Sequence, residues 1–92
     1  MTLCEKLEEL GYECQNLWFK YFKYYYDIDV EVCIKLDSIG EEIETYGVCE
    51  DGSGLFLYKQ KEIDNMQIAF NRVQKDIKEV EKWLKMKAKL TK

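Results

Sequence analysis

The chain has 92 residues and a formal net charge of −4, and 47% of its residues are hydrophobic. A chain of this length predicts one domain spanning residues 1–92, and its apolar content excludes an intrinsically disordered protein. No apolar run approaches the about 20 residues of a membrane-spanning helix, and the N-terminal MTLCEKLEEL lacks the apolar stretch of a signal peptide. We therefore expect a soluble, cytoplasmic protein with no membrane partner.

Residues 2–11, TLCEKLEELG, are predicted to form a short helix. Thr2 and Glu5 have the spacing of a capping box, which satisfies the first backbone N–H groups of a helix. Gly11 suits the left-handed position that ends many helices, and Tyr12 can fold back onto the helix beyond it. One face of this helix is apolar, formed by Leu3, Leu7 and Leu10 with Cys4 beside them.

Residues 17–50 are predicted to form a three-stranded antiparallel meander. The run from Trp18 to Tyr26 consists only of aromatic residues and lysines, and such aromatic density favours a strand. The next segment, DIDVEVCIKLD, alternates apolar and polar residues, which is typical of a half-buried strand. The two strands are expected to pair through a tight turn around residues 25–27.

The third strand, EEIETYGVCE, follows a turn at DSIG. Placing Leu36 opposite Glu41 brings Ile34 opposite Ile43, so that apolar residues meet on one face. The segment LFLY, residues 55–58, is expected to add a short fourth strand or to lead into the last helix.

Residues 59–90 are predicted to form a long amphipathic helix. The favoured interpretation lays its apolar stripe across the sheet, with Ile68 and Trp83 widening the apolar face. The alternative is a coiled-coil homodimer through the same stripe, although we favour a monomer. The fold class is then α+β, in the order α-β-β-β-α. The stripe consists of Ile63, Met66, Phe70, Val73, Ile77, Val80 and Leu84.

Charge is divided unevenly along the chain. Residues 1–58 carry 13 acidic and 4 basic side chains, whereas residues 59–92 carry 10 basic and 5 acidic ones. Strand alternation places several carboxylates together on the face away from the core, where like charges are unfavourable. A solvated acidic surface explains this pattern, and so does a surface that binds a basic groove. The candidate partner-binding residues are Asp29, Glu31, Glu42, Glu44, Tyr46 and Glu50.

The aromatic run also matches the way in which proteins stack the bases of single-stranded nucleic acid. The carboxylates that follow, Asp27, Asp29 and Glu31, would repel phosphates, so strong direct binding is not expected. We favour a core role for most of these rings, with Phe22 and Tyr24 among the candidate anchors for a protein partner. A small nucleic-acid-binding regulator is the alternative, and its candidate residues are Trp18, Lys20, Lys23, Lys82, Lys85 and Lys87.

Catalytic and metal-binding signals are weak. Histidine, the commonest acid–base residue, is absent, and no nucleophile elbow or Gly-rich phosphate loop is present, so we expect a protein that is not an enzyme and has no cofactor. The four cysteines are expected to be reduced thiols, buried as small apolar groups. Their spacing lacks a CxxC pair, which leaves a zinc site only as the alternative; its ligands would be Cys4, Cys14, Cys33 and Cys49.

The order of segments resembles small accessory proteins of phages and prophages of Gram-positive bacteria. It combines a helix that ends in ELGY, an aromatic strand, the alternating strand DIDVEVCIKL, a third strand, a glycine loop and a long amphipathic helix. Proteins of this kind include acidic anti-CRISPR inhibitors, which occupy the nucleic-acid or target-loading surface of a type II effector nuclease. The resemblance implies a host-defence inhibitor in the cytoplasm of an infected bacterium, and it assigns no residue a role.

The leading hypothesis is therefore a non-catalytic inhibitor that presents its acidic hairpin to a basic surface of a host defence protein, such as a type II CRISPR effector nuclease. The basic C-terminal helix departs from a pure DNA mimic and leaves room for a second, acidic partner. A helix-mediated structural homodimer is a further alternative.

Overall fold

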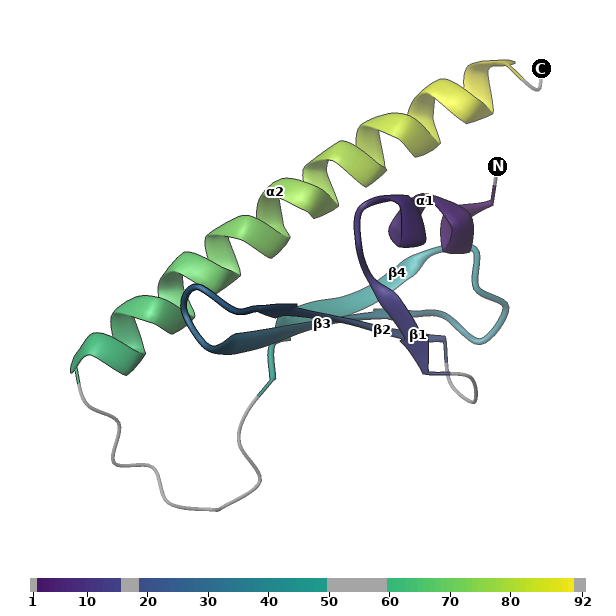
Figure 1. Cartoon of the computed structure of the whole chain (residues 1–92). Helices are drawn as coiled ribbons and strands as arrows, with labels where there is room; N and C mark the ends of the chain where they lie inside the picture. Colours follow the sequence, from purple (N-terminus) through teal and green to yellow (C-terminus); the bar gives the residue numbers. More distant parts are fainter. Residues whose placement is uncertain (1, 16–18, 50–59, 91–92) are drawn as a thin grey trace.

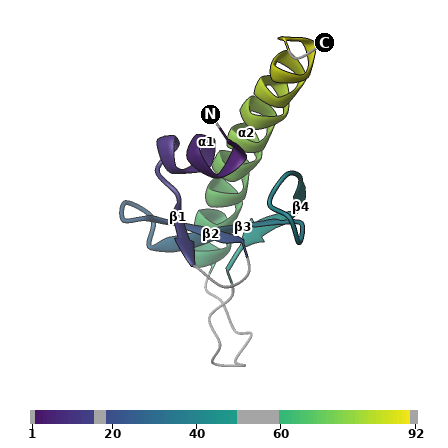
Figure 2. The same cartoon turned by 90° about the vertical axis from the view of Figure 1, so that its right-hand side faces the viewer.

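The helices and strands follow one another in a simple order. A computed structural model describes residues 2–15, 19–49 and 60–90 of the chain. All four strands form one antiparallel sheet in the order β1-β2-β3-β4, and both helices lie on the same face of it (Figures 1 and 2). The elements are α1 (Leu3–Glu9), β1 (Glu13–Gln15), β2 (Lys20–Tyr25), β3 (Val30–Leu36), β4 (Ile43–Val48) and α2 (Gln60–Leu90).

The predicted α+β fold is confirmed, with an antiparallel meander and a long C-terminal helix packed on the sheet. The structure adds one strand that was not predicted, β1, which pairs with β2. The LFLY segment, residues 55–58, lies outside the described residues.

Both ends of α1 are capped as its sequence predicts. The Thr2 hydroxyl accepts from the Glu5 N–H at 3.2 Å, and the Glu5 carboxylate accepts from the Thr2 N–H at 3.0 Å. At the other end Gly11 has a φ of +96°, and the Tyr12 N–H donates to the Leu7 carbonyl at 3.0 Å. This left-handed turn brings the Tyr12 side chain back into the core, where it is buried.

The apolar stripe of α2 is buried against the sheet and α1. Val73, Ile77 and Val80 are fully buried, together with the strand residues Val32 and Ile34. The helix-on-sheet interpretation is therefore confirmed, and the sheet occupies the seam that a coiled coil would need.

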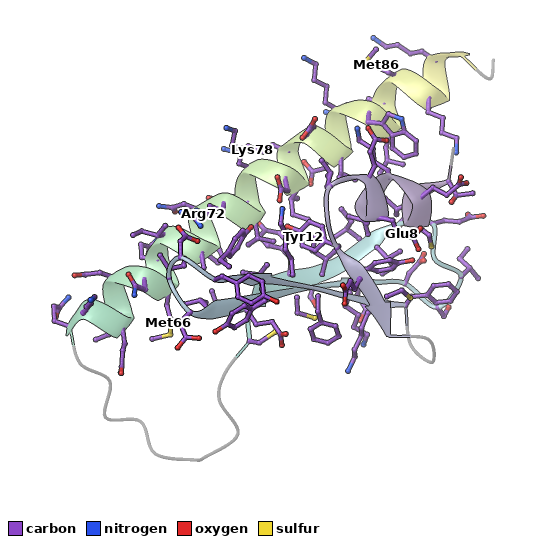
Figure 3. The ribbon with its side chains drawn as sticks, viewed as in Figure 1. Glu8, Tyr12, Met66, Arg72, Lys78 and Met86 are labelled. Carbon is purple, nitrogen blue, oxygen red and sulfur yellow. The ribbon has the colours of Figure 1, made fainter. Side chains whose placement is uncertain are left out.

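The two ends of α2 differ from its middle. Ile63 at the start of the stripe is 45% exposed, and Ile68 is 41% exposed, so Ile68 does not widen the buried face as predicted. Trp83 does pack partly against the core. The last turns extend past the sheet, and Met86 there is 57% exposed (Figure 3).

The predicted register between β3 and β4 is wrong. Leu36 pairs with Ile43 and Ile34 with Tyr46, and the ladder has an irregularity between Lys35 and Leu36. The turn is longer than predicted because the Asp37 carboxylate accepts from the N–H groups of Glu41 and Glu42, at 2.9 and 3.3 Å. A bulge also puts one extra residue into β4, which reverses the alternation of side chains beyond it.

Two separate constraints favour glycine at position 40 in this turn. Its φ is +71°, a conformation that a side chain disfavours. A Cβ added at this position would also lie 2.8 Å from a ring carbon of Phe19, which packs across the turn. The contact ties the β3–β4 turn to the start of β2.

We predict that Gly40→Ala lowers the free energy of unfolding by about 1–2 kcal/mol, because it forces a Cβ into the left-handed region and against the Phe19 ring. Urea denaturation followed by circular dichroism measures this change. Gly47→Ala in β4 is the matched control, since a Cβ there meets nothing within 4 Å. The control should be neutral or slightly stabilising, and an equal loss in both variants would contradict the prediction.

Candidate functional site: the open face of the sheet

One face of the sheet is covered by helices, and in the described chain the other face is not. Strand alternation turns Tyr21, Val32 and Ile34 toward the helices, where they are buried. The residues between them in the strands point to the opposite side of the sheet, which we call the open face. The open face consists of Glu13, Lys20, Phe22, Tyr24, Glu31, Cys33, Lys35, Thr45 and Gly47.

The aromatic run is divided between the core and the surface. Tyr21 is buried, and Tyr25 packs half-buried against the core. Tyr24 on the open face is 38% exposed, and Tyr26 in the following turn is 88% exposed. The rings of Tyr24 and Tyr26 contact each other edge to face, with their centroids 4.8 Å apart. Tyr24 and the half-buried Phe22 are thus on the surface, as expected for anchors, while Trp18 lies outside the described residues.

Two carboxylates border these rings. Glu13 lies opposite Phe22 in the sheet, and Glu31 lies opposite Tyr24. Asp29 was predicted on a strand but lies in the β2–β3 turn, with a φ of +54°. Among the described residues the ion pairs are Asp27–Arg72 and Lys35–Glu44, so none of these three carboxylates is paired with a base.

The predicted acidic array on β3 and β4 is not a single surface. Glu44 pairs with Lys35 at 3.5 Å, and Glu42 lies in the β3–β4 turn, where its carbonyl accepts from the Asp37 N–H at 2.9 Å. Tyr46 faces the core and stacks on Phe70, with ring centroids 5.9 Å apart. The longer turn explains why Glu42 and Glu44 lie away from Glu31, and the bulge explains why Tyr46 turns inward. Glu50 lies outside the described residues.

Two hollows flank Glu31. The larger has a volume of about 630 Å³ and lies between the β2–β3 turn, the end of β4 and the first turns of α2. Asp27, Asp29 and Glu31 are among the residues that line it. The smaller has a volume of about 240 Å³, and its lining includes five residues that we call the aromatic–acidic patch: Glu13, Phe22, Tyr24, Tyr26 and Glu31.

The β2–β3 turn, which borders both hollows, is held against α2. The Arg72 guanidinium donates to both oxygens of Asp27, at 3.0 and 2.8 Å, and stacks over the Tyr25 ring at 4.9 Å. This bond holds the pKa of Asp27 below its usual value. The Asn65 amide also donates to the Ile28 carbonyl at 3.3 Å. Arg72 and Asn65 therefore fix the position of the turn relative to the helix.

Lys23 is not a surface cation. Its ammonium donates to the Leu10 carbonyl at 2.8 Å and lies over the rings of Tyr12 and Tyr25, at 5.3 and 5.5 Å. Tyr12 lies between the sheet and α2, and its hydroxyl donates to the Asp76 carboxylate at 2.7 Å (Figure 3). Lys23 therefore joins β2 to the end of α1, so its ammonium is engaged within the fold.

The rest of the predicted nucleic-acid-binding set is scattered. Lys20 is half-buried on the open face, at the opposite end of β2 from Tyr24 and Tyr26. Lys82, Lys85 and Lys87 are exposed on the last turns of α2, and the Lys87 ammonium lies over the Trp83 ring at 5.1 Å. The structure does not join the aromatic strand and the lysine-rich helix end into one surface.

The four cysteines form two separate pairs. Cys4 and Cys14 lie beside the Tyr21 hydroxyl on the core side, and Cys33 lies beside Cys49 on the open side. Burial is the main cause that raises the pKa of the Cys33 thiol and raises that of Cys49 to about 12. No three histidine, cysteine or carboxylate side chains of the described chain lie close enough to hold a metal ion. The predicted zinc ligands are therefore not brought together.

Two residues of the aromatic–acidic patch were missed by sequence analysis, Glu13 and Tyr26. The segment YECQ alternates between the buried Tyr12 and the half-buried Cys14 on one side and the exposed Glu13 on the other, so its period could have indicated β1. The exposure of Tyr26 depends on where the turn begins, and sequence alone does not define that point.

Comparisons with protein-family models, with curated proteins and with solved structures give no match. Neither helix of the described chain is long and apolar enough to cross a membrane. Function is therefore inferred from the geometry, which places exposed rings beside carboxylates that have no ion-pair partner within the described part of the chain.

We predict that stability falls as the pH rises above about 10. Burial raises the pKa of Tyr12, Tyr21 and Tyr25 above the ordinary value of about 10. Below that pH both states keep these protons, whereas above it the unfolded chain releases them and the folded chain does not, so the free energy of unfolding decreases. Urea denaturation at a series of pH values from neutral to alkaline measures the slope.

Tyr12→Phe should make this alkaline slope shallower, because about one proton fewer distinguishes the folded from the unfolded state. It should also lower stability at neutral pH by about 1.5–3 kcal/mol, because the part-buried bond to the Asp76 carboxylate is lost. Tyr26→Phe is the control, since its ring is exposed. The pKa values of Cys33 and Cys49 are also raised, so these thiols contribute to the slope as well. The contribution of Tyr12 is therefore the difference in slope between the wild type and Tyr12→Phe. A stability that stays constant through alkaline pH would contradict the prediction.

Proposed function

We propose that the protein is a non-catalytic binding protein that docks through the aromatic–acidic patch onto a basic surface of another protein. The observation that supports this is the position of Glu13 and Glu31, which have no ion-pair partner among the described residues and flank the exposed rings of Tyr24 and Tyr26. Exposed tyrosines beside charges are typical of the anchors of protein interfaces.

The charges determine which kind of partner fits. Within residues 2–49 there are eleven acidic and four basic side chains, and one of those bases, Lys23, is bound to Leu10. Such a surface repels phosphates and attracts basic proteins, and long-range attraction speeds their association. Basic surfaces that match it occur where proteins bind nucleic acid.

The partner that we propose is therefore the nucleic-acid-binding surface of a host defence nuclease, such as a type II CRISPR effector. Occupying that surface would block loading of the nucleic acid without any catalysis by the inhibitor. This follows the resemblance to anti-CRISPR inhibitors that the sequence suggests, and it moves the proposed binding surface from the β3–β4 hairpin to the β1–β2–β3 part of the open face.

A pull-down with a purified type II effector nuclease at moderate salt tests this proposal. Reversing Glu13 and Glu31 to Lys should reduce retention of the nuclease by at least about tenfold, because both replace attraction by repulsion. Reversing Glu41 and Glu42 to Lys is the matched control, since these exposed residues lie in the β3–β4 turn at the other end of β3. The control should bind like the wild type.

Two outcomes would contradict the proposal. Loss of binding only in the Glu41/Glu42 variant would return the site to the β3–β4 hairpin. No retention of the nuclease by the wild-type protein, with or without its guide RNA, would remove this class of partner.

The end of α2 favours a second candidate function, binding of nucleic acid. This helix runs past the sheet and α1, and its last turns expose Lys82, Lys85 and Lys89 (Figure 1). If this end bound DNA or RNA in the cell, affinity would fall steeply with salt and Lys85→Glu with Lys89→Glu would abolish it. We expect no retention on DNA or RNA at physiological salt, and a salt-sensitive complex there would favour the second function.

A further inference from the structure

We infer that the smaller hollow of the open face is a receptor for one arginine side chain of the partner protein. This rests on the proposed function, because it assigns the chemistry by which the aromatic–acidic patch recognises a basic surface. The volume of about 240 Å³ is below the about 300–1,000 Å³ of small-molecule sites, so the hollow suits a single side chain.

The walls of the hollow follow from the register of the sheet. Phe22 and Tyr24 are two residues apart on one face of β2, which separates them by about 6.6 Å. Glu13 stands across from Phe22 on β1, and Glu31 stands across from Tyr24 on β3. The two carboxylates therefore lie on opposite sides of the pair of rings, on a diagonal across β2.

The end of β1 leaves this hollow accessible from the side. The β1–β2 ladder stops at Glu13 and Phe22, so Tyr24 has no strand partner on that edge among the described residues. The chain before Glu13 lines the hollow at Gly11, whose N–H donates to the Glu8 carbonyl at 3.0 Å at the end of α1. A side chain from a partner can therefore enter beside Tyr24 without displacing a strand.

The hollow has a net negative charge. Lys23 is the one base among its lining residues, and its ammonium is held by the Leu10 carbonyl at the C-terminal end of α1. The Lys23 ammonium therefore interacts with the C-terminal end of α1 and with the rings of Tyr12 and Tyr25. Neither Glu13 nor Glu31 has an ion-pair partner among the described residues, and the neighbour recorded for the Glu31 carboxylate is the neutral thiol of Cys49.

Arginine fits these walls better than lysine. A guanidinium is planar, stacks on aromatic faces, and its five N–H donors reach carboxylates on two sides at once. Lysine carries a compact, strongly hydrated charge, which gains less from the rings and cannot fork between Glu13 and Glu31. The Tyr24–Tyr26 pair, at an interplanar angle of 73°, offers a ring face as one wall.

Titration of the purified protein with acetyl-Gly-Arg-Gly-amide tests the inference, followed by NMR of the aromatic rings. We expect saturable shifts of the Tyr24 and Tyr26 signals. Glu13→Gln and Glu31→Gln keep the side-chain shape and remove the charge, and each should weaken binding by about tenfold or more. Glu42→Gln, in the distant β3–β4 turn, is the control and should bind like the wild type. Acetyl-Gly-Lys-Gly-amide should bind more weakly than the arginine peptide.

Three results would overturn the arginine receptor: no saturable shift at Tyr24 and Tyr26, equal affinity for the lysine peptide, or unchanged affinity in both Gln variants. The peptide titration needs no nuclease, so the two proposals fail separately. A positive titration with no nuclease retained removes only the proposed partner. A nuclease retained by the wild type with a negative titration removes the receptor and keeps the docking face.

Discussion

The structure depends on one constraint, which is that both helices cover the same face of the sheet. A strand residue then has one of two environments, and the parity of its position decides which. Val32 and Ile34 form the core, whereas Glu31 and Cys33 between them lie on the open side. The same parity divides the tyrosines, because Tyr21 supports the fold and Tyr24 meets solvent. Position in the pleat, rather than residue type, separates the structural aromatics from the exposed ones.

Polar contacts among α1, α2 and the strands hold the open face in position. Lys23 joins β2 to the end of α1, and Tyr12 joins the following chain to Asp76 on α2. Arg72, one turn earlier on α2, holds the β2–β3 turn through Asp27. These bonds lie on the helix side, yet they fix the strands that present Glu13, Tyr24 and Glu31 on the other side. The candidate binding face is thus positioned by residues that do not belong to it.

Sequence patterns were informative where a single period governs a segment. The heptad stripe predicted the buried face of α2 from Val73 to Val80, and the Thr2–Glu5 spacing predicted the start of α1. The β3–β4 register failed because it depends on the turn made by the Asp37 carboxylate and on a bulge, and neither alters the apolar pattern enough to be read. The candidate site inherited this error, since Glu42 and Glu44 were placed by the wrong register and Tyr46 by parity through the bulge. Glu31 precedes the irregularity on β3 and was placed correctly.

The bulge also affects the free edge of the sheet. β4 is an outer strand, and an outer strand with unpaired backbone groups is a template for pairing with another chain. A bulge bends and twists a strand, which makes a long, flat alignment with a second copy unfavourable. Glu44 adds a charge to the same edge, half exposed beside Lys35. The irregularity that obscures the register in the sequence thus also shapes the outer edge of the described sheet.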